Sequence, residues 1–131
     1  PLGIIPHQDY WENRTDWESS YQFGSVIYLN TPDECIGGTN LYSYRGEMSM
    51  IFDPITVGET YNINGPVLES LSEEQKFKST KDKVNKQYTV EFQADMVYNR
   101  MFLYQSDVLH SADVDLGMFT NYNRMNQIFF L

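Results

Sequence analysis

Residues 21–29 read YQFGSVIYL, a run of aromatic and β-branched side chains bounded by polar stretches, which is typical of a β-strand. Similar runs occur at residues 39–44, 88–92, 96–104 and 125–131, with a looser one at residues 47–52. Several short strands joined by loops are typical of a β-sandwich or a β-barrel. The sequence therefore predicts an all-β core.

An insertion is predicted at residues 53–87. It begins with a Pro- and Gly-containing part and continues as a Lys- and Glu-rich stretch. A helix is predicted over residues 67–83, where Ser72 and Gln75 have the spacing of a capping box, and a solvated loop is the alternative. Because long insertions in compact domains are often lids, we expect this one to lie near the mouth of the barrel.

Length and composition indicate one globular domain spanning residues 1–131. The chain is 41% hydrophobic and 15% aromatic, which is enough to build a core. Its formal net charge of −9 would repel phosphate backbones, so nucleic acid is a disfavoured partner. It carries no continuous apolar run of about 18 residues, so no membrane-spanning segment is expected.

The single cysteine, Cys35, has no second cysteine with which to form an internal disulfide. This favours a reducing compartment, and we expect a cytoplasmic location. The chain opens at Pro1 rather than at Met and enters an apolar stretch at once, so we expect that an upstream part is missing.

The two histidines and one aspartate form a candidate metal site. His7 and Asp9 are two residues apart, so a strand would present both on one face. His110 follows an apolar run suited to a central strand. Two histidines and a carboxylate are the ligand set of non-haem Fe(II) oxygenases, and their donor atoms should lie within about 3–4 Å of one another. Taken singly, each residue fits a surface pair or a structural hydrogen bond equally well.

Arg124 stands at the start of the last apolar run, NRMNQIFF, at residues 123–130. An arginine in a core strand is costly unless it is paired. A dicarboxylate ligand is a natural partner, because the planar guanidinium matches the geometry of a carboxylate. The alternatives are a pair with one of the acidic side chains of this chain, or a side chain that points into solvent.

The order of these motifs resembles the double-stranded β-helix core of Fe(II)/2-oxoglutarate-dependent oxygenases, most of all the prolyl-4-hydroxylase-like branch. The resemblance covers nearly the whole chain outside residues 53–87. It rests on His7-x-Asp9, Ile27-Tyr28-Leu29-Asn30, Gly37-Gly38-Thr39-x-Leu41, NRMFLYQSD at residues 99–107, His110 and Arg124. The fold that it implies is a jelly-roll or cupin-like double-stranded β-helix.

The resemblance implies that His7, Asp9 and His110 bind Fe(II), and that Arg124 and Tyr28 bind the distal carboxylate of the cosubstrate 2-oxoglutarate. The implied reaction hydroxylates a C–H bond of a protein side chain or a small molecule and releases succinate and CO2. A carboxylate at position 9 favours hydroxylation over halogenation. The strand and helices that precede His-x-Asp in the family are missing or very short here.

Two alternatives belong to other classes of protein. A cupin-like metal-binding β-barrel with another activity would explain the three metal ligands, but not Arg124 and Tyr28. A non-enzymatic β-sandwich that serves as an interaction domain would leave Arg124 without a reason.

Overall fold

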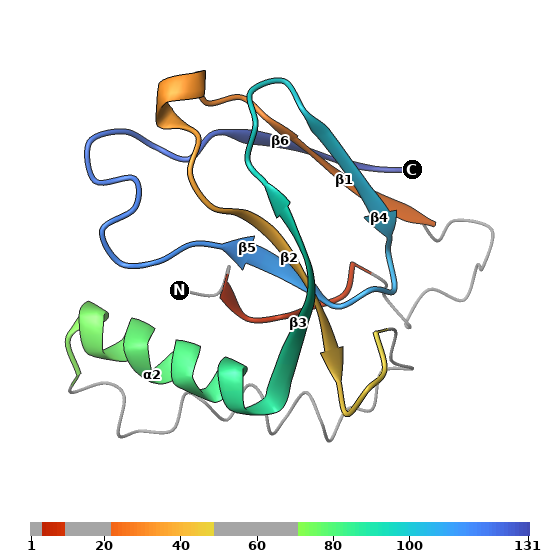
Figure 1. Cartoon of the computed structure of the whole chain (residues 1–131), viewed down its shortest axis with the longest axis vertical. Coiled ribbons are helices and arrows are strands. Elements are labelled where there is room, and N and C mark those ends of the chain that lie inside the picture. Colours follow the sequence, from red (N-terminus) through yellow and green to blue (C-terminus); the bar gives the residue numbers. More distant parts are fainter. Residues whose placement is uncertain (1–3, 10–21, 49–70) are drawn as a thin grey trace.

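The computed structural model describes residues 4–9, 22–48 and 71–131. In this part of the chain, strands form two antiparallel three-stranded sheets, β4-β1-β6 and β3-β2-β5 (Figure 1). The elements are β1 (Phe23–Tyr28), the short 3-10 helix η3 (Pro32–Glu34), β2 (Gly38–Tyr44), α2 (Glu73–Gln87), β3 (Tyr88–Asp95), β4 (Met101–Gln105), β5 (His110–Asp113) and β6 (Asn126–Phe130). The predicted all-β core is confirmed.

The strand pairings are nested along the chain. β2 pairs with β3, β1 pairs with β4, and the segment at His7 pairs with the start of β5. This outermost pair consists of two backbone hydrogen bonds of 2.9 Å between His7 and His110. Because successive pairs alternate between the two sheets, the chain winds around one interior. That winding brings segments far apart in sequence to the same end of the core.

Most strands lie where the sequence predicts them, but two differ. β4 begins only at Met101, because the chain turns just before it and Asn99 has a φ of 59°. β5 has no counterpart among the predicted strands, since its sequence HSAD is short and polar. The looser run at residues 47–52 lies mostly outside the described residues.

The interior between the sheets contains the buried side chains of Val26, Tyr28 and Met96. Phe102 packs against them from β4, and Tyr104 is buried further along the same strand. Met101 and Leu103, which alternate with these two aromatic residues, are about half exposed. This period of two is what a strand with one buried face produces.

Helix α2 covers the outer face of sheet β3-β2-β5. Its Val84 packs against Tyr42, Tyr88 and Leu109. The Tyr42 hydroxyl accepts a hydrogen bond of 3.1 Å from Ser111, and Ser111 follows His110 in β5. Because neighbouring residues of a strand point to opposite faces, α2 and the His110 side chain lie on opposite sides of this sheet.

The predicted capping box is confirmed. The Ser72 hydroxyl accepts from the backbone N–H of Gln75, and the Gln75 side chain accepts from the backbone N–H of Ser72. The helix continues to Gln87, beyond its predicted end. As α2 lies on the face away from the histidines, the predicted lid role is wrong for this helix, and residues 53–70 of the insertion lie outside the described residues.

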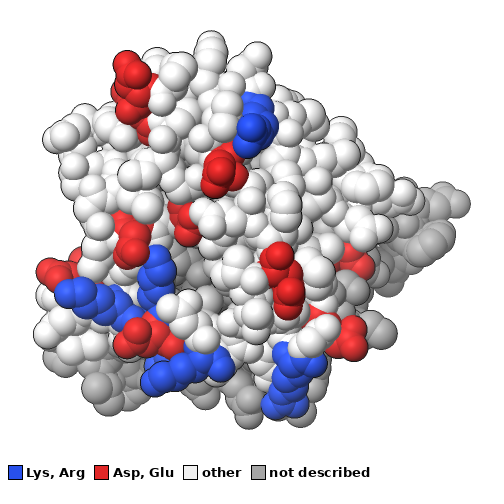
Figure 2. Space-filling view, viewed as in Figure 1, with Lys and Arg blue, Asp and Glu red and all other residues white. Residues whose placement is uncertain are grey.

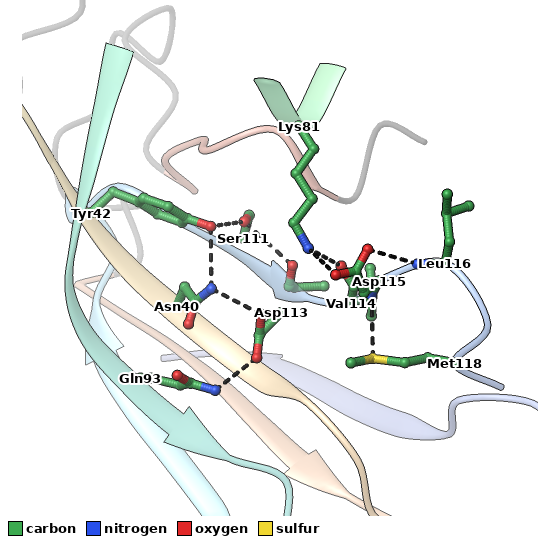
Figure 3. Close-up of polar contacts among 11 residues, drawn as sticks. Asn40, Tyr42, Lys81, Gln93, Ser111, Asp113, Val114, Asp115, Leu116 and Met118 are labelled. Atoms are coloured by element: carbon green, nitrogen blue, oxygen red, sulfur yellow. Dashed lines mark hydrogen bonds and ion pairs between the residues drawn. The ribbon is translucent and has the colours of Figure 1, made fainter. Parts of the chain in front are cut away.

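A polar layer ties α2 to the sheet beneath it (Figure 3). The Asp113 carboxylate accepts hydrogen bonds from Asn40 at 3.2 Å and from Gln93 at 2.7 Å. Lys81 of α2 forms an ion pair of 3.1 Å with Asp115, which lies just after β5. The helix is therefore held by polar contacts as well as by Val84.

Charged side chains gather around α2 on the face seen in Figure 2, where basic and acidic residues alternate, and much of the remaining face is uncharged. Lys76 pairs with Glu73 at 2.7 Å and Lys78 with Glu74 at 2.6 Å, both one turn apart. No helix among the described residues has the length and apolar character needed to cross a bilayer.

Candidate metal centre

Backbone pairing brings the three predicted metal ligands together. The hydrogen bonds between His7 and His110 set their rings side by side, with centroids 4.5 Å apart. Asp9 is held by a 2.9 Å hydrogen bond from its backbone N–H to the Ser106 carbonyl. The Asp9 Oδ2 to His110 Nε2 distance is 3.4 Å, within the predicted range. The ligand atoms of all three residues, His7 included, lie within 4.8 Å of one another. His7 must therefore move closer to share an ion with the other two.

Both histidines are oriented to offer Nε2 to an ion. Nδ1 of His7 lies 2.9 Å from the Ile5 carbonyl, and Nδ1 of His110 lies 2.9 Å from the Val108 carbonyl. A carbonyl only accepts, so each Nδ1 is the donor, and in the neutral ring each Nε2 presents a lone pair. Burial, and then the neighbouring His7, lower the pKa of His110, which keeps its imidazole neutral as a metal ligand must be.

Tyr104 is a site residue that the sequence analysis missed. Its hydroxyl lies 3.2 Å from Asp9 Oδ2 and 3.1 Å from His110 Nε2. Burial, and then the Asp9 carboxylate, raise the pKa of Tyr104. The signal in the sequence was its place two residues after Phe102, on the inward face of the same strand.

The absence of a side chain at Gly24 leaves room for the Asp9 carboxylate and the Tyr104 ring. Gly24 lies opposite Tyr104 in the register of β1 and β4. A Cβ at position 24 would lie 2.6 Å from Asp9 Oδ2 and 2.7 Å from Cε2 of Tyr104. Both distances are below normal van der Waals contact, so only glycine allows the carboxylate and the phenol ring to approach β1 this closely.

Gly24→Ala should therefore displace Asp9 and Tyr104. We expect a loss of about 1–3 kcal/mol in the free energy of unfolding from overpacking, together with weaker Mn²⁺ binding. Urea unfolding and calorimetric Mn²⁺ titration measure the two effects. The control is Gly46→Ala, where an added Cβ meets no atom of the described residues within 4 Å and the positive φ of 88° is the expected cost. Unchanged Mn²⁺ affinity in Gly24→Ala would contradict this account.

A cavity of about 190 Å³ joins the three ligands to Arg124. Its walls come from both sheets and from the N-terminal segment: His7, Asp9, Val26, Thr39, Tyr104, His110, Ser111, Ala112, Arg124, Asn126, Ile128 and Phe130. Arg124 lies two residues before β6 rather than inside it, and it is half-buried. The structure thus brings the predicted metal ligands and the predicted anion-binding residue to one cavity.

Arg124 is incompletely paired. Its Nη2 donates to the Gly38 carbonyl at 3.0 Å, while its Nε is buried without a hydrogen-bond partner among the described residues. It makes no ion pair with any acidic side chain that the structure describes. Burial lowers the pKa of Arg124. A buried guanidinium with a free donor is the environment that an anionic ligand would complete.

Tyr28 lies beside Arg124 but outside the cavity wall. It is fully buried, and the Arg124 guanidinium carbon lies 6.0 Å from the centre of its ring. Its hydroxyl is 2.7 Å from Oγ1 of Thr39, which does line the cavity. Thr39, another residue that the sequence analysis missed, thus connects Tyr28 to the cavity. Direct binding of a carboxylate by Tyr28 stays a prediction.

Asn30 fixes the backbone on both sides of Arg124. Its side chain is fully buried, donates to the Asn123 carbonyl at 2.8 Å and accepts from the backbone N–H of Met125 at 2.6 Å. The neighbouring Leu29 N–H donates to the Met125 carbonyl at 3.0 Å. One amide side chain therefore holds the segment that carries the guanidinium.

Asn30→Ala should lower the free energy of unfolding by about 1–2 kcal/mol, since it removes the fully buried amide and with it the hydrogen bonds to the Asn123 carbonyl and the Met125 N–H. Urea unfolding measures this loss. Asn123→Ala is the matched control, because position 123 supplies only its backbone carbonyl to the contact with Asn30. Equal stability of the two variants would mean that the amide does not hold this segment.

In a comparison with protein-family models, residues 1–124 match a family of unknown function, DUF6445. No curated protein and no solved structure matches the chain.

Proposed function

The chain belongs to the DUF6445 family, whose function is unknown, and we propose that it is an Fe(II)/2-oxoglutarate-dependent oxygenase. The proposed reaction hydroxylates a C–H bond of a protein side chain or a small molecule and releases succinate and CO2. The proposed metal ligands are His7, Asp9 and His110, and the proposed cosubstrate-binding residues are Arg124 and Tyr28. The single free cysteine suits the reducing compartment, such as the cytoplasm, that we propose for it.

One observation carries this proposal. The two-histidine, one-carboxylate cluster lines the same cavity as an arginine whose buried Nε has no hydrogen-bond partner in the described part of the chain. The cluster alone would suit many metal-binding barrels. The arginine adds a site for an anion at the same cavity, which is what a ligand with a chelating end and a distal carboxylate requires.

The fold supports the same proposal. A double-stranded β-helix is a long antiparallel hairpin wound into two facing sheets, and the nested pairs His7–β5, β1–β4 and β2–β3 support this description. In such a winding the outermost pair lies at one end of the core. Here that pair carries both histidines. We therefore propose the double-stranded β-helix as the finer description of this all-β core.

The donor set fits Fe(II). Two neutral imidazoles and one carboxylate cover one face of an octahedral ion and leave the other face for the cosubstrate. The bound iron would supply the oxidative chemistry. The protein contributes orientation: the Ile5 and Val108 carbonyls hold the imidazoles, and Arg124 binds the distal carboxylate.

Thermal unfolding with Mn²⁺, 2-oxoglutarate, or both tests this function against its rivals. Mn²⁺ replaces Fe(II) without redox chemistry. A ligand at 100 times its Kd stabilises the folded state by about 2.7 kcal/mol, which raises Tm by several degrees. We expect Mn²⁺ to raise Tm, and 2-oxoglutarate to raise it further only when Mn²⁺ is present.

Glutarate is the matched control ligand, because it has the distal carboxylate but lacks the 2-oxo group that chelates the metal. It should add little to the effect of Mn²⁺. Stabilisation by Mn²⁺ alone would favour the cupin-like barrel with another activity. No stabilisation by either ligand would favour the interaction domain. Succinate release from 2-oxoglutarate with Fe(II) in air measures the activity itself.

A further inference from the structure

The atoms at the centre of the cluster have too few protons for their contacts. Asp9 Oδ2, His110 Nε2 and the Tyr104 hydroxyl oxygen lie 3.1–3.4 Å from one another. His110 Nδ1 faces the Val108 carbonyl, so in the neutral imidazole that binds a metal Nε2 is an acceptor. The carboxylate oxygen is also an acceptor. The single phenol proton satisfies one of the three close contacts and leaves lone pairs facing each other in the others.

A cation would satisfy all three atoms at once. Bonds from a first-row metal to oxygen or nitrogen are about 2.0–2.2 Å, so neighbouring ligand atoms of an octahedral ion lie about 2.8–3.1 Å apart. The Tyr104 oxygen lies 3.1 Å from His110 Nε2 and 3.2 Å from Asp9 Oδ2. These distances are shorter than the 4.8 Å spread of the cluster that includes His7. The Tyr104 oxygen is therefore at least as well placed as His7 to share an ion with Asp9 and His110.

We propose that Tyr104 is a fourth protein ligand of the metal, which binds the ion together with His7, Asp9 and His110 when 2-oxoglutarate is absent. This inference rests on the metal centre of the proposed function. To bind as a phenolate, Tyr104 loses its O–H proton to solvent and forms an oxygen–metal bond, with no change in the oxidation state of either. Gly24 permits this position, since a Cβ there would press on the Tyr104 ring.

The fourth ligand has a consequence for the cosubstrate. Four protein ligands and a chelating 2-oxoglutarate would fill all six positions of an octahedral ion. Dioxygen could then bind only after one ligand leaves. Tyr104 is the ligand that 2-oxoglutarate displaces: its oxygen–metal bond breaks, the phenolate takes a proton back from solvent, and the hydroxyl then donates to Asp9.

Visible spectroscopy of the iron-loaded protein tests this proposal. Ferrous ammonium sulfate is added without oxygen and then oxidised in air without 2-oxoglutarate. A phenolate bound to Fe(III) gives a visible charge-transfer band, which we expect in the wild type and not in Tyr104→Phe. The band should fade when 2-oxoglutarate is added, and a band that persists after 2-oxoglutarate binds would overturn the displacement. In parallel, Tyr104→Phe should weaken Mn²⁺ binding at least about tenfold by calorimetry.

Tyr42→Phe is the matched control. It is also a buried tyrosine with a hydrogen-bonded hydroxyl, but it lies on the face of the sheet that α2 covers, and it should keep the band. Equal Mn²⁺ affinity in wild type and Tyr104→Phe, with no band in either, would overturn the fourth ligand and leave the three-ligand centre intact. A wild type that binds neither Mn²⁺ nor iron would overturn the metal centre itself, and with it the proposed function.

Discussion

Asp9→Asn should remove metal binding while the protein stays folded. The substitution keeps the size of the side chain but removes the charge that an ion needs beside two neutral imidazoles. An amide at position 9 can donate to His110 Nε2 or accept from Tyr104, so the contacts around it lose little. We expect the Mn²⁺ affinity to fall by about 100-fold or more, since changes to groups outside the ligand set already cost about 10- to 100-fold.

Calorimetric titration with Mn²⁺ measures the affinity, and succinate release with Fe(II) measures the activity, which should fall to background. Asp33→Asn is the matched control, as Asp33 is an exposed carboxylate in η3. His7→Ala should likewise remove turnover of 2-oxoglutarate. If Asp9→Asn or His7→Ala turned over 2-oxoglutarate at the wild-type rate, these residues would not be iron ligands.

Local patterns were enough to predict the elements that carry strong side-chain signals. The aromatic and β-branched run at residues 21–29 contains β1, and the spacing of Ser72 and Gln75 marks the start of α2. The prediction that His7, Asp9 and His110 converge rested on the order of the motifs and on the family resemblance. It could be tested only once the pairing of His7 with β5 was known, because that contact spans most of the chain.

Features that depend on long-range contacts were missed for the same reason. The sequence HSAD of β5 has no strand signal, and its strand conformation follows from pairing with β2. In the sequence, Tyr104 is one of several aromatic residues in an apolar run, and nothing local marks it as a site residue. Asn30 read as the end of a motif, yet its amide holds the backbone on both sides of Arg124 from more than 90 residues away in sequence. The sequence did not predict which face of the sheet α2 covers, because the helix has few apolar residues.

Arg124→Ala should weaken 2-oxoglutarate binding while leaving metal binding nearly unchanged. The guanidinium lines the cavity with the three proposed ligands. Within the described ranges its buried Nε has no hydrogen-bond partner, and it makes no ion pair with an acidic side chain. A carboxylate bound there would make a charge-assisted contact worth about 1.5–3 kcal/mol, or roughly 10- to 150-fold in affinity. The free energy of unfolding without ligand should change little, because among the described residues the substitution removes one hydrogen bond, to the Gly38 carbonyl, and the contact with the Tyr28 ring.

The measurement is a titration of 2-oxoglutarate into Mn²⁺-loaded protein, with the Mn²⁺ affinity of each variant determined first. Arg124→Lys should recover part of the loss, because it restores the charge but not the paired donors of the guanidinium. Arg100→Ala is the matched control, since Arg100 is exposed and its side chain donates to the Asp95 carbonyl, away from the cavity. If Arg124→Ala bound 2-oxoglutarate as tightly as the wild type, the cavity would not hold the cosubstrate in the proposed way. The cupin-like metal barrel would then be the better account, because that fold needs the three ligands and gives Arg124 no role.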